Sequence, residues 1–317
     1  MRRFSASGLG KSYGPVTALR GLDLELEGGT ITGLVGPDGA GKTTTMRLLT
    51  GLLRPDSGRV MLDGEDVTGQ RARGGRIGYM PQRFSLYPDL SVAENLRFYA
   101  ELFGVRGSER RRRTARLLDF ARLEAFTRRR AAALSGGMKQ KLALACTLIH
   151  APGVLLLDEP TTGVDPVSRV EFWDILGSLR EEGTAILVST PYMDEADRCD
   201  EVIVLREGRV LDRGDPAQLR SRFPHQVLEV EVSSMEAAVR VLEGTGWVRD
   251  AVPFGSRLHI TVETGAADPD RVRGLLQEEG LDVQAVRRVS PGMEDVFIAL
   301  AAADPAHLRQ PGGGQEP

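Results

Sequence analysis

The sequence predicts an α/β protein built around a parallel sheet and followed by a smaller α+β domain, and three observations support this prediction. The apolar run at residues 31–35 leads into a glycine-rich loop and then into a helix-forming segment. Largely apolar runs at residues 154–157 and 185–189 alternate with helical patterns, which is typical of a parallel sheet covered on both faces. Beyond about Phe223 the predicted order becomes strand, helix, strand, strand, helix, strand, as in ferredoxin-like modules.

The length of the chain, 317 residues, is too great for one average core and suits two domains. We expect a first domain over residues 1–223, which includes a helical subdomain over about 84–150, and an accessory α+β domain over residues 224–303. The tail at residues 304–317 is expected to be disordered. The accessory domain shows no cluster of catalytic residue types, so we expect it to bind a partner or stabilise a dimer.

Composition limits the class of protein. The net charge of −3 gives no electrostatic reason to expect a nucleic-acid partner. Cys146 and Cys199 lie in unrelated settings, so no disulfide framework is expected and a reducing compartment fits. The sequence has no run of about 18 apolar residues and no apolar signal core, so any membrane role is expected to come from a partner. Basic clusters at residues 110–113 and 128–130 are expected to be solvated faces, with a partner or lipid-headgroup contact as the alternative.

The elements of the first domain are predicted in chain order. Two strands, at residues 4–11 and 18–26, are joined by a turn that contains Gly14 and Pro15, and further strands follow at residues 60–62 and 77–80. A capping box at residues 91–94 begins a helix that Gly104 ends, and a second helical region covers about 109–125. The remaining elements are helices at 139–149, 167–181 and 193–198 and strands at 154–157, 185–189, 201–205 and 210–213.

In the accessory domain the same criteria predict four strands and two helices. The strands cover residues 228–232, 247–252, 257–262 and 283–289, and the helices cover residues 235–243 and 268–279.

The glycine-rich loop has the residue types that bind phosphate. Its glycines allow backbone N–H groups to converge on an anion, and the helix that follows presents the positive end of its dipole. Lys42 would reach the β- and γ-phosphates, and the Thr43 hydroxyl would bind Mg²⁺. The predicted nucleotide contacts in this P-loop are Gly36, Asp38, Gly39, Ala40, Gly41, Lys42, Thr43 and Thr44.

Four further motifs follow the loop in a fixed order: Gln82, the stretch Leu134–Gln140, the stretch Leu157–Pro160 and the stretch Thr162–Asp165. With the loop, they make residues 4 to about 215 similar to the ATP-binding subunit of an ATP-binding-cassette (ABC) transporter. The resemblance implies a P-loop NTPase fold with a RecA-like parallel core, an antiparallel β part and a helical subdomain.

The resemblance also implies roles for individual residues. Mg²⁺ would be held by Thr43, Asp158 and Gln82, because this hard cation takes oxygen donors. Glu159 would act as the general base toward water, assisted by Gln82. Tyr13, on the first turn, would stack on adenine. Ser135 and Gly137 begin a helix and would complete the γ-phosphate site of a second subunit, so function requires a dimer.

Three positions depart from the family pattern. Asp38 stands where asparagine is usual, and Met138 replaces the commoner glutamine. Pro191 occupies the position of a histidine that contacts the γ-phosphate, and the four histidines, His150, His225, His259 and His307, lie elsewhere. Because proline has no side-chain donor, we expect ATP to bind but to be hydrolysed slowly.

The function that this resemblance implies is an ATPase subunit on the cytoplasmic face of the cell membrane. It would energise export through separate multi-span permease subunits and pair with a second cassette, in a homodimer or a heterodimer. The stretches Gln82–Ser91 and Ser290–Phe297 resemble the exporter branch with single-cassette subunits. Two alternatives remain: a largely non-hydrolysing cassette that regulates a complete partner, and a soluble ABC protein outside transport. The transported substrate is not expected to be recognised by this chain.

Overall fold

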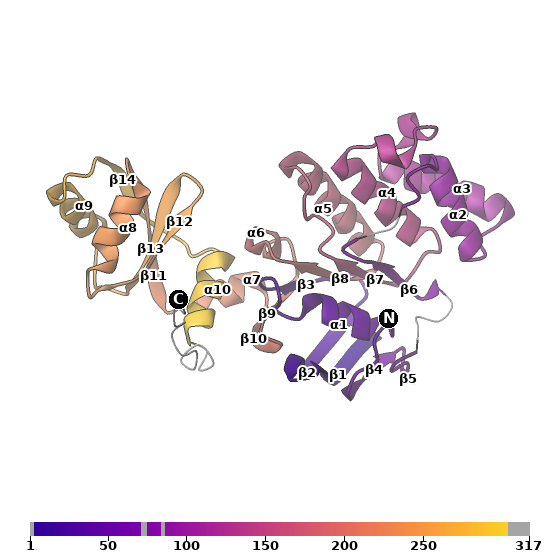
Figure 1. Ribbon diagram of the computed structural model, residues 1–317, viewed down its shortest axis with the longest axis horizontal. Helices are drawn as coiled ribbons and strands as arrows, with labels where there is room; N and C mark the ends of the chain where they lie inside the picture. The colour runs from indigo at the N-terminus through magenta and orange to yellow at the C-terminus, as the bar shows by residue number, and fades with distance from the viewer. Residues whose placement is uncertain (1–2, 71–74, 84–85, 304–317) are drawn as a thin grey trace, which may run out of the picture. The chain divides into compact units, whose positions relative to one another are not determined.

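The computed structural model describes residues 3–70, 75–83 and 86–303 (Figure 1). The chain divides into two compact units that meet between Asp215 and Pro216. This division lies eight residues before the boundary expected from the sequence, because the short helix α7 (Pro216–Ser221) packs against α10 (Met293–Ala303) of the second unit. The tail that was expected to be disordered lies outside the described residues.

The first unit is organised by a six-stranded sheet in the order β10-β9-β3-β8-β7-β6. Neighbouring strands are parallel except β10, which is antiparallel to β9. Every residue of β3, β7 and β8 is buried, as expected for strands covered on both faces. The strands are β3 (Ile31–Val35), β6 (Ile77–Met80), β7 (Val154–Asp158), β8 (Ala185–Thr190), β9 (Glu201–Arg206) and β10 (Arg209–Gly214).

An antiparallel sheet in the order β2-β1-β4-β5 forms a second layer. Helix α1 (Lys42–Leu49) lies between the two sheets (Figure 1), and one apolar cluster contains residues of both sheets and of the helix, among them Phe4, Met46 and Leu187. The strands are β1 (Arg3–Tyr13), β2 (Val16–Glu27), β4 (Ser57–Leu62) and β5 (Glu65–Asp66). This layered α/β architecture confirms the predicted fold class.

The helices on the other face of the parallel sheet are α2 (Val92–Leu102), α3 (Gly107–Phe120), α4 (Gly136–Leu148), α5 (Pro166–Glu181) and α6 (Met193–Ala196) (Figure 1). The capping box of α2 is present, with reciprocal bonds between Ser91 and Glu94. Helix α3 ends five residues before the predicted Ala125, because Arg122 adopts a left-handed φ of 54°. Short 3₁₀ turns follow at Glu124–Phe126 and Ala131–Ala133. The described residues include no helix that is long and apolar enough to cross a membrane.

The second unit has a four-stranded antiparallel sheet in the order β12-β13-β11-β14, which is the predicted ferredoxin-like arrangement. Helices α8 (Met235–Glu243) and α9 (Pro269–Glu278) cover one face. Helix α10, which the predicted order of elements lacks, lies on the other (Figure 1). The strands are β11 (His225–Val232), β12 (Val248–Phe254), β13 (Arg257–Glu263) and β14 (Val283–Val289).

A histidine anchors α10 to this sheet. Along β13, Leu258 and Ile260 point into the core beneath α8 and α9, so His259 faces α10. Its Nδ1 lies 3.2 Å from Asp295 Oδ1, and its Nε2 lies 3.8 Å from Glu229 Oε2. The hydrogen bond to Asp295, followed by the charges of Asp295 and Glu229, raises the pKa of His259 above its ordinary value despite partial burial.

Asp295→Asn should therefore destabilise the second unit more at pH 6 than at pH 9. The folded pKa of His259 is raised, so its stabilisation is complete below the unfolded pKa of about 6.5 and is lost as pH rises through the folded value. We expect a difference of about 1–2 kcal/mol between the two pH values, from urea denaturation. Exposed Glu294→Gln on the same helix is the control and should keep the wild-type pH dependence. An equal loss at both pH values in Asp295→Asn would contradict a charged histidine.

Candidate nucleotide site

The glycine loop between β3 and α1 is held closely against neighbouring backbone. A Cβ added to Gly36 would lie 2.1 Å from the Leu205 carbonyl oxygen, and one added to Gly41 would lie 2.5 Å from that of Ala18. Gly41 also has a φ of 108°, which L side chains rarely adopt. Gly36 and Gly41 therefore require glycine for steric reasons, whereas at Gly39 only the positive φ of 80° favours it.

Lys42 is the first residue of α1, and its side chain folds back over the loop. Its Nζ donates to the carbonyl oxygens of Gly36 at 2.8 Å and Pro37 at 3.0 Å, and it forms an ion pair with Glu159 Oε1 at 3.1 Å. The side chains of Lys42 and Glu159 are only 3% and 6% exposed. The ammonium group is thus fixed at the N-terminus of a helix, where an anion is favoured.

The two acidic residues at the end of β7 have different surroundings. Asp158 Oδ1 accepts hydrogen bonds from Ser189 Oγ at 2.7 Å and Thr43 Oγ1 at 3.2 Å. Its buried Oδ2 has no hydrogen-bond partner among the described residues. Burial is the main reason that the pKa of Asp158 is raised, and the neighbouring charge of Glu159 adds to the effect. A bound cation would counteract both effects, because it would stabilise the charged carboxylate of Asp158.

The backbone of Glu159 adopts a left-handed conformation, which is unusual for a residue other than glycine. Its φ is 49°, and its N–H donates to Ser189 Oγ at 3.0 Å. Its carboxylate accepts from Gln82 Nε2 at 2.8 Å as well as pairing with Lys42. Left-handed φ values in non-glycine residues store strain that clusters at functional sites. The backbone turn thus places the carboxylates of Asp158 and Glu159 against different partners.

The predicted metal ligands fit Mg²⁺ by their chemistry. A hydroxyl, a carboxylate and an amide oxygen are hard donors, and Mg²⁺ is commonly bound through one or two carboxylates together with substrate phosphates. Thr43 and Asp158 touch each other, whereas Gln82 contacts Glu159 instead. The unpartnered Asp158 Oδ2 supports a cation at this point. Within the described part of the chain, no group of three or more His, Cys, Asp or Glu side chains could hold a metal ion.

The structure separates the signature residues from the loop. Ser135 caps α4 by accepting from Met138 N at 3.3 Å, and Figure 1 shows α4 and α1 on opposite faces of the parallel sheet. A Cβ on Gly137 would lie 2.3 Å from Ser168 Oγ of α5, so α4 and α5 meet closely there. Ser135 and Gly136 are exposed. The N-terminus of α4 therefore faces outward.

Tyr13 and Pro191 lie at the ends of strands. Tyr13 ends β1 and is 47% exposed, with Lys11 Nζ 5.9 Å from the centre of its ring. Pro191 follows β8 in a segment fixed by Thr190, whose Oγ1 donates to Glu195 Oε2 at 2.6 Å and accepts from Tyr192 N at 3.0 Å. The ring of Pro191 is held at the strand end without offering a donor.

Ser189 is a site residue that the sequence did not reveal. It is fully buried and joins β8 to Asp158, the last residue of β7, and to Glu159, which follows the strand. A serine at the end of an apolar strand has many ordinary uses. Its contact with the acidic residues follows only from its position beside Asp158 on the neighbouring strand. The sequence around Ser189 does not indicate this pairing of strands.

Comparisons with known proteins agree with this geometry. Residues 19–162 match the family model for the ABC transporter, and residues 214–301 match that for the C-terminal domain of DrrA1-3-like ATP-binding proteins. The chain is 38% identical over 315 residues to the Nod factor export ATP-binding protein I of Ralstonia nicotianae, covering 95% of this chain and 94% of that one. A solved dimeric structure of the bacterial ABC transporter cassette MJ0796 is 28% identical, has a TM-score of 0.61 and covers 67% of this chain and 98% of that one.

A second relative differs in length. The chain is 44% identical over 290 residues to the probable multidrug ABC transporter ATP-binding protein YbhF of Escherichia coli (strain K12). The match covers 89% of this chain but only 49% of YbhF, so the chain spans about half the length of that relative.

The fold and the phosphate loop define a P-loop ATP-binding cassette. The chain belongs to the ATP-binding subunits of ABC transporters, and its relatives include a Nod factor export protein and a probable multidrug transporter protein. The resemblance inferred from the motifs is confirmed.

Gly137→Ala should lower the free energy of unfolding by about 1–3 kcal/mol, because its Cβ would clash with Ser168 at the start of α5. Gly136→Ala is a matched control on the same helix turn, where the nearest atom to a Cβ is the Gly163 carbonyl oxygen at 3.7 Å. This control should be neutral or slightly stabilising, since alanine favours helix. Urea denaturation compares the two variants, and equal stabilities would contradict the close approach of α4 and α5.

Proposed function

We propose that this protein binds ATP with Mg²⁺ at the loop of residues 36–43 and hydrolyses it within a dimer, to drive export through separate membrane-spanning subunits. The observation that supports this most strongly is the buried Lys42–Glu159 pair beside the unpartnered oxygen of Asp158. A lysine, a general base and a metal carboxylate are thereby collected at the carboxyl edge of a parallel sheet, where ligands bind in such folds.

Nucleotide phosphates would take over the contacts that Lys42 makes now. The ammonium already lies over the loop, so small side-chain rotations would move it from the carbonyls of Gly36 and Pro37 to the phosphate oxygens. The free N–H groups at the start of α1 would add hydrogen bonds. Tyr13 is exposed enough to stack on the adenine ring.

Mg²⁺ would be held by Thr43, Asp158 and Gln82 together with phosphate oxygens, and when bound it would neutralise charge on the transferred phosphoryl group. The residues of the chain act around it. Glu159 gains freedom to accept a proton from water once Lys42 pairs with phosphate. Gln82, which now donates to Glu159, would link nucleotide occupancy to the segment that follows β6.

A second cassette would complete each site. The N-terminus of α4 begins at Ser135 and Gly136, which are exposed and lie away from the loop of their own chain, whereas Gly137 is buried. The free N–H groups of this first turn could therefore donate to a γ-phosphate held by a partner. The dimeric structure of a related cassette supports this arrangement. The partner is either a second copy of this chain or a different cassette.

The surface that contacts the permease would be formed by Gln82 and by the residues that come after it in the chain. A groove of about 310 Å³ is lined there by Gln82, Leu86, Pro88, Ala131 and Lys139, among others. Phe84 and Ser85 of this segment lie outside the described residues. A segment of a membrane subunit on the inner face of the cell membrane would contact this groove, and it would respond when Gln82 changes partner.

Glu159→Gln should retain ATP binding and stabilise the ATP-bound dimer. The substitution removes the base and the charge that Lys42 now neutralises, while Asp158, Thr43 and the loop remain. Light scattering during size-exclusion chromatography with MgATP, with any partner cassette supplied, should show a larger dimer fraction than wild type. Exposed Glu181→Gln is the control and should behave as wild type. A variant that remains monomeric with bound ATP would count against the dimer.

A second candidate function is a slow or regulatory cassette, and Pro191 favours it. Position 191 offers no donor to a γ-phosphate, whereas the outward-facing signature of the same chain is intact. In a mixed dimer this chain would complete its partner's site while its own site turned over slowly.

Pro191→His should raise ATP turnover of the isolated protein by roughly tenfold, somewhat below the usual worth of one preorganised transition-state donor. Pro191→Ala is the matched control, because it removes the fixed backbone φ without adding an imidazole. Phosphate release measured under saturating MgATP compares both with wild type. Brisk wild-type hydrolysis without a partner, unchanged in Pro191→His, would mean that another residue supplies this contact.

A further inference from the structure

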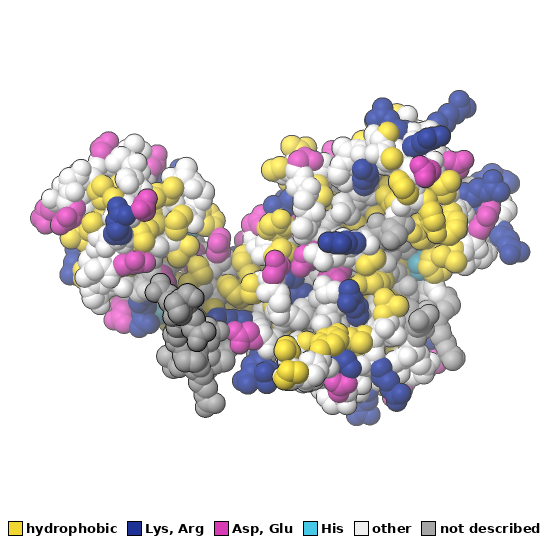
Figure 2. Space-filling model, in the orientation of Figure 1, with side chains coloured by type: hydrophobic (Ala, Val, Ile, Leu, Met, Phe, Trp, Pro, Cys, Tyr) yellow, Lys and Arg dark blue, Asp and Glu magenta, His cyan; other side chains and the backbone are white. Residues whose placement is uncertain are grey.

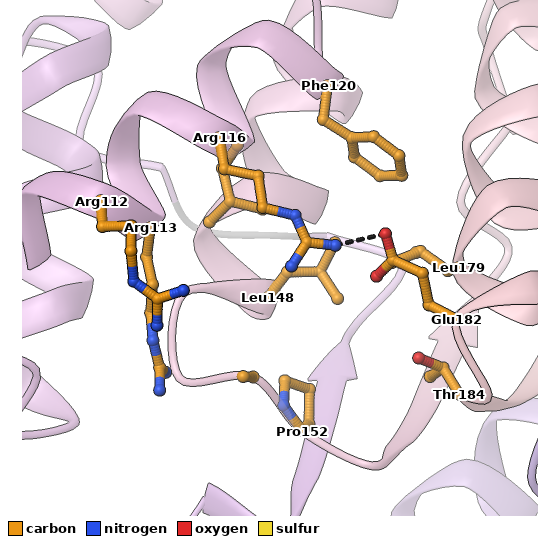
Figure 3. A pocket seen from close by; sticks show the side chains of 11 residues that line it. Arg112, Arg113, Arg116, Phe120, Leu148, Pro152, Leu179, Glu182 and Thr184 are labelled. Atoms are coloured by element: carbon orange, nitrogen blue, oxygen red, sulfur yellow. Dashed lines mark hydrogen bonds and ion pairs between the residues drawn. The ribbon is translucent and has the colours of Figure 1, made fainter. Parts of the chain in front are cut away.

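A cavity of about 190 Å³ lies on the side of the parallel sheet away from the glycine loop, and it is partly open to solvent (Figure 3). It is bounded by α3, the end of α4 and the end of α5. Pro152 and Thr184, which precede β7 and β8, form its base. It therefore lies at the amino ends of these strands, whereas Asp158 and Glu159 lie at the carboxyl end of β7. None of the nucleotide contacts proposed above lines it.

The inner wall of this cavity is apolar. Leu117, Leu148 and Leu179 belong to the buried core yet keep 6–8% of their surface exposed, and they line the cavity together with Phe120 and Pro152. The volume is somewhat larger than the roughly 150 Å³ of an engineered apolar cavity that binds benzene. An apolar body of about eight carbon atoms would fill such a space.

Three arginines of α3 form the remaining wall. Figure 3 shows Arg116 reaching across Leu148 to Glu182, with Arg112 and Arg113 side by side next to it. Arg112 and Arg113 both pair with Glu109, at 2.8 Å and 2.6 Å. The hydrogen bonds from Arg112 and Arg113 lower the pKa of Glu109, which is therefore ionised at neutral pH.

The charges at this wall do not balance. Arg116 is neutralised by Glu182, but Arg112 and Arg113 share a single carboxylate, which leaves one surplus positive charge beside the apolar wall. Guanidinium groups pair with carboxylates in planar, two-point geometry, and such hydrogen bonds are stronger than neutral ones. The surplus charge matches one anionic group on an otherwise apolar ligand.

We propose that this cavity binds a monoanionic amphiphile, a carboxylate carried on a small apolar body. The carboxylate pairs with Arg112 and Arg113 at the rim, and the body lies against Leu148 and Leu179. Such a ligand bridges α3 to the loop before β7 and to the end of α5, alongside the Arg116–Glu182 ion pair that already joins α3 to the end of α5. The proposal concerns a site separate from the nucleotide site and does not depend on ATP binding.

Calorimetric titration of the full-length protein with sodium octanoate, without nucleotide, tests the site. We expect a dissociation constant of about 1 mM, from the modest affinity per atom of small ligands. Acetate, which lacks the apolar body, and octylamine, which carries the opposite charge, should each bind at least about tenfold more weakly. No octanoate binding, or equal binding of octylamine, would overturn the proposal.

A pair of variants locates the binding. Arg112→Gln should weaken octanoate binding by about tenfold, the effect of losing roughly one charge-assisted hydrogen bond. Arg111→Gln is the control, because Arg111 lies on the same helix, is exposed and does not line the cavity. It should bind octanoate as wild type does. Equal weakening in both variants would mean that only the general charge of α3 attracts the anion, and no weakening in Arg112→Gln would place octanoate elsewhere.

Discussion

The buried ion pair between Lys42 and Glu159 is the interaction on which the arrangement of the site depends. It joins the first residue of α1 to the residue after β7, across the edge of a sheet whose inner strands are wholly buried. Removing two charged groups from water costs desolvation free energy. The attraction between the charges offsets this cost only when their geometry is good and further hydrogen bonds are present. Here the further bonds come from Gln82 and from the carbonyls of Gly36 and Pro37. The pair is thus held by groups that all belong to the proposed nucleotide site.

Much of this site could be predicted from the sequence, because its parts are local. A strand, a tight glycine turn and a helix form one continuous segment, and an apolar run ending in two acidic residues indicates a buried strand with its charges at the edge. The contacts that connect those parts could not be predicted in the same way. Ser189 reaches Asp158 and Glu159 only because β8 pairs with β7. Which strands pair in the sheet cannot be deduced from the local sequence. The left-handed backbone of Glu159 was likewise not evident, since no glycine marks it.

Boundaries differed where local geometry overrode the periodic pattern. Helix α3 stops at Phe120 because Arg122 turns the chain, although the residues beyond it continue to suit a helix. Helix α10 is connected to its sheet by a contact between Asp295 and a histidine on a distant strand. The order of the other elements in the second unit could be predicted from the alternating patterns of the sequence. Helix α10 could not, because its contacts with the sheet are known only from the structure.

The central claim is that Lys42 is the cation that this fold places for phosphate. Calorimetric titration of MgATP into wild type and Lys42→Ala tests it most directly, with Lys139→Ala as a control that removes an exposed lysine of the signature helix. The account predicts that Lys42→Ala weakens the affinity for MgATP by about a hundredfold or more. The substitution removes the buried ammonium group that would pair with the phosphates. Lys139→Ala should bind ATP as wild type does. Unchanged ATP affinity in Lys42→Ala would contradict the assignment of the site.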